Sequence, residues 1–144
     1  MRNAFEPEDP ITREIIGKSI AIHRLLGPGL LESAYEFFLV RELTKSGLKF
    51  ERQKPLPVEY DGVRVDIGFR PDLIVERQII VEIKAVQKLE HIHGAQLLSY
   101  LKLAEIETGL LINFHSDPLR NGIRRMSLSK TKPGFLGGLG ALGG

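Results

Sequence analysis

Residues 79–86 read Ile-Ile-Val-Glu-Ile-Lys-Ala-Val, an apolar stretch that contains two charged residues. Alternate side chains of a β-strand share a face, so the odd-numbered residues form one apolar face, whereas Glu82 and Lys84 share the other with Ile80. A strand this apolar is expected at the centre of a sheet, where a charge is costly unless it is paired or coordinates a metal ion. The two charges therefore form either an ion pair on a solvent-facing side of the sheet or a functional site.

Asp72 gives the functional explanation a definite geometry. If residues 76–78 form a three-residue loop, Val75 pairs with Ile79, and Asp72 then lies opposite Glu82 on the same face. Facing carboxylates have Cβ atoms about 4.5–5.5 Å apart and repel each other, and a bound hard cation removes that cost. A two-residue loop would place Asp72 on the other face. The hypothesis therefore depends on the longer loop.

Lys84 lies two residues beyond Glu82 and is expected to point into the same cleft. An ammonium group there can hold a phosphate oxygen and the attacking water, and can offset the charge that builds in the transition state. A metal ion would lower the pKa of a bound water and polarise the phosphoryl oxygen. Carboxylate ligands favour Mg²⁺ or Mn²⁺ over zinc. The sequence thus predicts a divalent-metal phosphodiesterase site around Asp72, Glu82 and Lys84.

The apolar periodicity changes from helical to alternating around residue 50. Helices are expected at residues 12–26, 30–46 and 89–104, and strands at 54–60, 63–69, 72–75, 79–85, 108–114 and 123–128. Thr12 is expected to cap the first helix, and Asp61-Gly62 to form a tight hairpin turn. The second helix is apolar on most sides and is expected to be largely buried. The element order is taken as ααβββαβ, which predicts an α/β fold with a mixed sheet flanked by helices.

The composition predicts a single domain over residues 1–130 and a flexible glycine-rich tail over residues 131–144. The absence of cysteine excludes disulfides, thiolate zinc sites and cysteine nucleophiles. No apolar run is long enough to span a bilayer and the N-terminus does not have the pattern of a signal peptide, so a cytoplasmic protein is expected. Basic residues gather near the end and suit either a phosphate backbone or a solvated segment: Arg120, Arg124, Arg125, Lys130 and Lys132.

Five motifs in order resemble the GxxExxY protein family, over about residues 11–128. They are Gly29-Leu-Leu-Glu32-Ser-Ala-Tyr35, Arg70-Pro-Asp72-Leu-Ile-Val, Val81-Glu82-Ile-Lys84-Ala, His93-Gly-Ala-Gln96-Leu-Leu-Ser-Tyr100 and Gly109-Leu-Leu-Ile-Asn113-Phe114. The family is placed in the PD-(D/E)XK nuclease superfamily. The resemblance implies a mixed-sheet core and metal-dependent cleavage of nucleic acid, with DNA favoured over RNA. Gly94 departs from the pattern, which puts the contacts at the start of the third helix in doubt.

The resemblance also assigns roles to side chains outside the central strand. Glu32 matches the helix-borne acid that joins Asp72 and Glu82 around the metal, although an acid in a first helical turn is favoured by the helix dipole in any case. Tyr35, one turn further on, is expected to be a packed aromatic. Asn113 is expected to satisfy backbone groups at the end of its strand.

Gln96 and Tyr100 are four residues apart and share one edge of the third helix with His93. They resemble the Q-x-x-x-Y element of the recombination-exonuclease branch, in which the glutamine positions nucleic acid or a metal-bound water. Gln96 is therefore a candidate catalytic residue, and His93 and Tyr100 are candidate substrate contacts. The alternative is a polar pair at the edge of the core.

Three functions remain open on the sequence. The first is a nuclease in which Glu32, Asp72 and Glu82 bind Mg²⁺ or Mn²⁺ and Lys84 and Gln96 assist. The second is a module of the same fold that binds nucleic acid or protein without turnover. The third is an oligomeric interaction protein, for which the apolar second helix would supply the interface.

Overall fold

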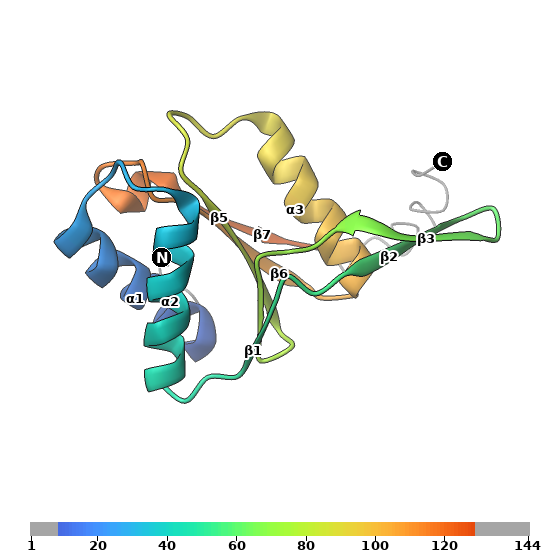
Figure 1. Ribbon diagram of the computed structural model, residues 1–144, viewed down its shortest axis with the longest axis horizontal. Helices are drawn as coiled ribbons and strands as arrows, with labels where there is room; N and C mark the ends of the chain where they lie inside the picture. The colour runs from blue at the N-terminus through green and yellow to red at the C-terminus, as the bar shows by residue number, and fades with distance from the viewer. Residues whose placement is uncertain (1–8, 129–144) are drawn as a thin grey trace, which may run out of the picture.

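Strand β5, Ile79–Lys84, lies in the middle of a five-stranded sheet (Figure 1). The computed structural model describes residues 9–128. The strand order is β1-β4-β5-β6-β7, with β1 at Phe50–Arg52, β4 at Leu73–Val75, β6 at Thr108–Asn113 and β7 at Ile123–Ser127. β5 and β6 run parallel, and the other neighbouring strands run antiparallel. The expected α/β class with a mixed sheet is confirmed.

Helices cover both faces of this sheet. Helices α1, Pro10–Leu26, and α2, Glu32–Lys45, lie on one face, and α3, His91–Ala104, lies on the other (Figure 1). The odd-numbered residues of β5 belong to the core beneath α1 and α2, whereas Ile80 packs with Leu97 and Leu101 of α3. The face of β5 that carries Glu82 and Lys84 therefore points to the α3 side.

The loop between β4 and β5 has the predicted length of three residues. Val75 pairs with Ile79 and Leu73 with Val81, so residues 76–78 form the three-residue connection. Glu76 and Arg77 adopt left-handed backbone conformations, with φ of 52° and 57°, and the Gln78 N–H donates to the Val75 carbonyl at 2.9 Å. The predicted register is confirmed.

Strands β2, Leu56–Tyr60, and β3, Val63–Phe69, pair only with each other and project from the body of the molecule (Figure 1). Their turn is the predicted one, and Asp61 and Gly62 both have positive φ, as a two-residue hairpin turn requires. Five strands separate α2 from α3: one in each of the four expected ranges, and β1 in addition. The expected order ααβββαβ, with three strands there, is therefore wrong. The unforeseen element is β1, whose three residues are too few to show a period.

Two expectations about the helices are also corrected. Asp9, not Thr12, caps α1: both the N–H and the hydroxyl of Thr12 donate to the Asp9 carboxylate, at 2.6 and 2.8 Å. Helix α2 buries only the stripe that faces the sheet, and Phe37, on another side, is 60% exposed. Helix α2 is exposed on its other sides because it lies on the outside of the sheet and packs against it on one side only.

The expected tail at residues 131–144, together with Lys130, lies outside the described residues. Within residues 9–128, no helix combines the length and the apolar character that crossing a membrane requires.

Candidate active site

The site begins where β4 and β5 bring two carboxylates together. The N–H of Asp72 donates to Oε2 of Glu82 at 2.7 Å, and the N–H of Ile83 donates to Oδ2 of Asp72 at 2.8 Å. Each acid therefore accepts a bond from the main chain of the opposite strand. These bonds continue the β4–β5 register by one pair and hold both side chains on the α3 face.

The position of Glu82 is electrostatically costly. Its side chain is buried, and burial together with the nearby charge of Asp72 raises the pKa of Glu82 to about 8. The hydrogen bond from Asp72 and the charge of Lys84 act in the opposite direction, and the charge of Glu32 adds a smaller upward contribution. A carboxylate of this kind is stabilised by a cation that replaces the lost solvent.

Lys84 and Gln96 complete one group of polar side chains with Glu82. Lys84 Nζ lies 3.9 Å from Glu82 Oε1 and donates to Oε1 of Gln96 at 3.5 Å. Lys84 comes from the end of β5 and Gln96 from the second turn of α3, and both side chains are half-buried. The structure therefore brings together Asp72, Glu82, Lys84 and Gln96, which the sequence had selected.

Gln53 is a neighbour of the site that the sequence did not indicate. Its N–H donates to the carbonyl of Asp72 and its side-chain Nε2 donates to Oδ1 of Asp72, both at 3.1 Å. The contact arises because β1 pairs antiparallel with β4, with Arg52 opposite Leu73, so that the next residue meets Asp72. No pattern in the sequence marked β1, and hence none marked Gln53.

Tyr100 lies on the site side of α3, where it is buried and makes an edge-to-face contact with Phe69 of the hairpin at 6.2 Å between ring centroids. Burial, followed by the charges of Glu82 and Asp72, raises the pKa of Tyr100. The phenol thus keeps its proton in the field of the two acids.

His93 has a structural task at the start of α3. Its Nδ1 accepts a bond from the N–H of Glu90 at 2.8 Å, and the Glu90 side chain in turn accepts from the main chain of His93, which forms a capping box. Gly94, at which the sequence departs from the family pattern, follows His93 and faces β7. A Cβ at this position would lie 3.4 Å from Cε of Met126.

Glu32 is the first residue of α2 and is exposed. Within residues 9–128, no three His, Cys, Asp or Glu side chains are close enough together to hold a metal ion. The close pair is Asp72 and Glu82, and Glu32 acts on it through its charge. Glu32 as a third ligand stays a prediction.

Tyr35 explains the glycine of the GxxExxY pattern. Its hydroxyl donates to the Gly27 carbonyl at 2.6 Å and accepts from the Leu30 N–H at 3.1 Å, and its ring stacks on Phe114. Gly29, inside this loop, has a φ of 109°, which glycine adopts without strain. Tyr35 is a packed residue, as expected, and it fixes the loop that leads to Glu32.

Asn113 also has the expected role. Its side chain exchanges two hydrogen bonds with the main chain of Val86, at 2.9 and 3.0 Å, and accepts a third from the His115 N–H. It thereby fixes the segment that leaves β5 after Lys84.

Comparison with known proteins identifies the family. The model of the PD-(D/E)XK nuclease superfamily matches residues 9–126, and the chain belongs to this superfamily. Among solved structures, the crystal structure of SSO0001 has a similar fold, with a TM-score of 0.51 and 23% identity over 92% of this chain and 69% of that one. No curated protein matches the chain.

The superfamily's nucleases generally use divalent metal ions, and the residues of this chain fit such an ion. Each of the two carboxylates accepts a hydrogen bond from the main chain of the opposite strand. Burial, followed by the charge of Asp72, raises the pKa of Glu82, and a bound cation would offset both effects. An all-oxygen donor set suits Mg²⁺ or Mn²⁺.

Proposed function

We propose that this chain is a divalent-metal-dependent nuclease that hydrolyses phosphodiester bonds, with DNA favoured over RNA, and that it is a member of the GxxExxY family. The observation that supports the proposal most is the grouping of Asp72, Glu82, Lys84 and Gln96 on one face of the sheet, within a chain of the PD-(D/E)XK superfamily. The ion would be Mg²⁺ or Mn²⁺, and when bound it would supply Lewis-acid activation of a water and of the phosphoryl oxygen.

The roles of the side chains follow from their places. Asp72 and Glu82 would hold the ion, with Glu32 as the third acid. Lys84, half-buried and 3.9 Å from Glu82, would orient the attacking water and offset the negative charge that develops on the phosphate. Gln96 accepts a hydrogen bond from Lys84, and so it would fix the direction of the ammonium group.

Two groups on α3 would contact the substrate. Tyr100 has a protonated hydroxyl beside the acids, so it would donate to a phosphate oxygen. His93 uses Nδ1 in the capping box, which leaves Nε2 as the ring nitrogen for a phosphate or a base.

The test is cleavage of single-stranded DNA, double-stranded DNA and RNA in Mg²⁺ and in Mn²⁺. Glu82→Gln and Lys84→Met should each lower the rate at least a hundredfold, in line with the loss of one transition-state contact. Glu59→Gln on the exposed hairpin and Lys45→Met at the end of α2 are the matched controls and should cleave at the wild-type rate. Cleavage that survives Glu82→Gln and Lys84→Met would refute the proposed site. Salt-dependent binding in EDTA without any product would instead identify a binding module.

A further inference from the structure

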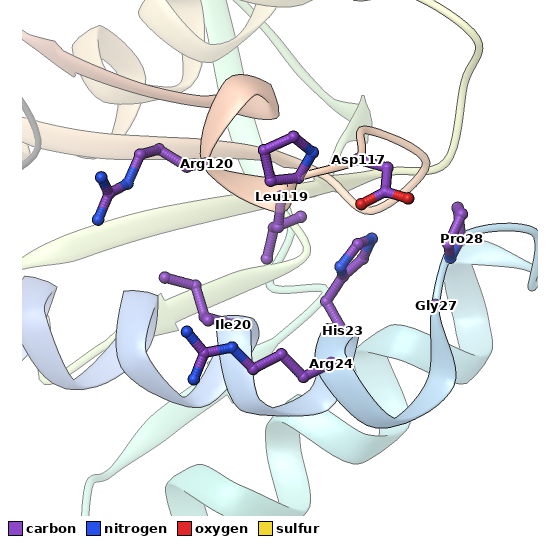
Figure 2. Close-up of a pocket in the computed structure, with 9 residues that line it drawn as sticks. Ile20, His23, Arg24, Gly27, Pro28, Asp117, Leu119 and Arg120 are labelled. Atoms are coloured by element: carbon purple, nitrogen blue, oxygen red, sulfur yellow. The ribbon is translucent and has the colours of Figure 1, made fainter.

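A hollow lies between α1 and the segment that follows β6 (Figure 2). We call it the α1–η1 pocket, after the helical turn η1, Leu119–Gly122, that forms one wall. Its volume of about 550 Å³ falls within the range of small-molecule sites. None of the side chains assigned to the candidate active site lines it.

His23 of α1 has an unmet hydrogen-bonding group at this pocket. Figure 2 shows its ring pointing from α1 toward the segment that carries Asp117 and Leu119. The residue is only 7% exposed, and within the described part of the chain its Nε2 has no hydrogen-bond partner. A buried ring nitrogen without a partner is unfavourable, so the position suits a ligand that supplies one.

The charges around the pocket select the kind of ligand. Arg24 comes from α1 and Arg120 from η1, so cationic groups stand on two walls, and Asp117 adds an acid. Arg24 also offsets the dipole at the end of α1. A bare anion would meet both Asp117 and the negative end of the helix. The ligand must therefore carry hydrogen-bond donors as well as negative charge.

The remaining lining is apolar and includes Ile20 and Leu119. A flat apolar group, N–H donors and a phosphate occur together in a nucleotide. Aliphatic side chains would cover the base, Asp117 would accept from its N–H groups, and the arginines would hold the phosphate.

The pocket lies at the same end of the sheet as the candidate active site. In the parallel β5–β6 pair Asn113 is opposite Lys84, and the Phe114 N–H donates to the Lys84 carbonyl at 2.8 Å. Asp117 follows Phe114 by three residues, a span of at most about 11 Å. On the other wall, Gly27 begins the loop that leads to Glu32.

We propose that the α1–η1 pocket binds one nucleotide of the nucleic-acid strand that occupies the candidate active site, with the phosphate toward Arg24 and Arg120 and the base toward Asp117. This inference rests on the proposed function, because it takes the strand at Lys84 as given. It adds a subsite on a different face of the protein from α3.

Binding of nucleoside 5′-monophosphates tests the ligand class, with the matching nucleosides and inorganic phosphate as separate arms, all in EDTA. At least one monophosphate should bind about tenfold more tightly than its nucleoside or phosphate alone. Arg24→Gln should weaken monophosphate binding about tenfold, as expected for one charged hydrogen bond. Arg41→Gln removes the same charge from the exposed side of α2, outside the pocket, and should have no effect. Equal effects of the two variants, or phosphate bound as tightly as any monophosphate, would overturn the inference.

His23 provides an independent variant. His23→Leu removes the unpartnered nitrogen, so the protein should unfold at the same or a higher temperature while monophosphate affinity falls. His23→Gln keeps a polar group and should retain more of that affinity than His23→Leu. Unchanged monophosphate affinity in His23→Leu would count against the pocket as the site.

A short single-stranded oligonucleotide, also in EDTA, tests whether the nucleotide belongs to the substrate strand. Arg24→Gln should reduce the slope of log affinity against log salt by about 0.7, the value for one phosphate contact on a single strand. If wild-type protein cleaves nucleic acid but Arg24→Gln binds the oligonucleotide with wild-type affinity and slope, the subsite is wrong and the nuclease stands. If no substrate is cleaved but Arg24→Gln weakens both ligands, the nuclease fails and the pocket stands.

Discussion

Asp72 and Glu82 are joined through the main chain of their strands: the Asp72 N–H donates to Glu82 Oε2 at 2.7 Å, and Asp72 Oδ2 accepts from the N–H that follows Glu82 at 2.8 Å. This exchange fixes the positions of both carboxylates through the main chain. The arrangement has an electrostatic cost, because burial and the charge of Asp72 raise the pKa of Glu82.

That cost predicts the pH dependence of the metal-free protein. The pKa of Glu82 rises from 4.5 in the unfolded chain to about 8 in the folded one, so its contribution to stability is complete below about pH 4.5 and is lost as pH rises through 8. The free energy of unfolding in EDTA should fall by a few kcal/mol over this window. Urea unfolding at intervals from pH 5 to pH 9 measures the fall.

Glu82→Gln isolates the effect from that of other titrating groups. The variant keeps an acceptor for the Asp72 N–H but has no proton to lose, so its stability should depend less on pH than that of the wild type. If the free energy of unfolding depended on pH in the same way in both proteins, ionisation of Glu82 would not destabilise the folded state.

A divalent ion should remove the same cost. At pH 7, Mn²⁺ at about a hundred times its dissociation constant should stabilise the wild-type protein by about 2.7 kcal/mol. Asp72→Asn removes one acid and should lose most of this gain, while Asp66→Asn on the hairpin should keep it. Thermal unfolding with Mn²⁺ and with EDTA measures both differences, and an equal gain in the two variants would exclude Asp72 as a ligand.

Gln53 is expected to be a positioning residue for Asp72. Gln53→Ala removes the 3.1 Å bond from Nε2 to Oδ1 but leaves the main-chain bond, so stability should change by less than about 1 kcal/mol while cleavage slows about tenfold. The backbone at Gln53 has a φ of 51°, which glycine adopts more easily. Gln53→Gly should therefore be as slow as Gln53→Ala but more stable. If substrate affinity changed and the rate at saturation did not, Gln53 would be a substrate contact instead.

The centre of the site was predictable because strand geometry is strict. Once residues 76–78 form the loop, parity alone places Asp72 opposite Glu82, and Lys84 follows on the same face. Gln96 was added by resemblance, and the 3.5 Å bond from Lys84 agrees with that choice.

Other features depend on contacts that a local pattern does not encode. β1 is three residues long, and it forms by pairing with β4, which is distant in the sequence. The sequence around Gln53, which follows β1, therefore did not indicate its contact with Asp72. At α1, Asp9 and Thr12 are both capping residues three apart, and Pro10 in the first turn is the feature that favours Asp9. The exposure of Phe37 follows from the place of α2 outside the sheet, which its composition does not reveal.

Tyr35 links the stability of the fold to the position of Glu32. Tyr35→Phe keeps the ring stacked on Phe114 but removes the hydroxyl that bonds both the Gly27 carbonyl and the Leu30 N–H, two partly buried groups. The variant should lose about 1–3 kcal/mol of stability in urea unfolding. Tyr60→Phe makes the same change on an exposed ring and should lose almost nothing. Because the loop leads directly to Glu32, Tyr35→Phe should also weaken Mn²⁺ binding. The double variant with Tyr35→Phe and Glu32→Gln should bind Mn²⁺ no more weakly than Glu32→Gln alone. A loss of stability with unchanged Mn²⁺ affinity would separate the loop from the metal site, and unchanged Mn²⁺ affinity in Glu32→Gln would exclude Glu32 as the third ligand.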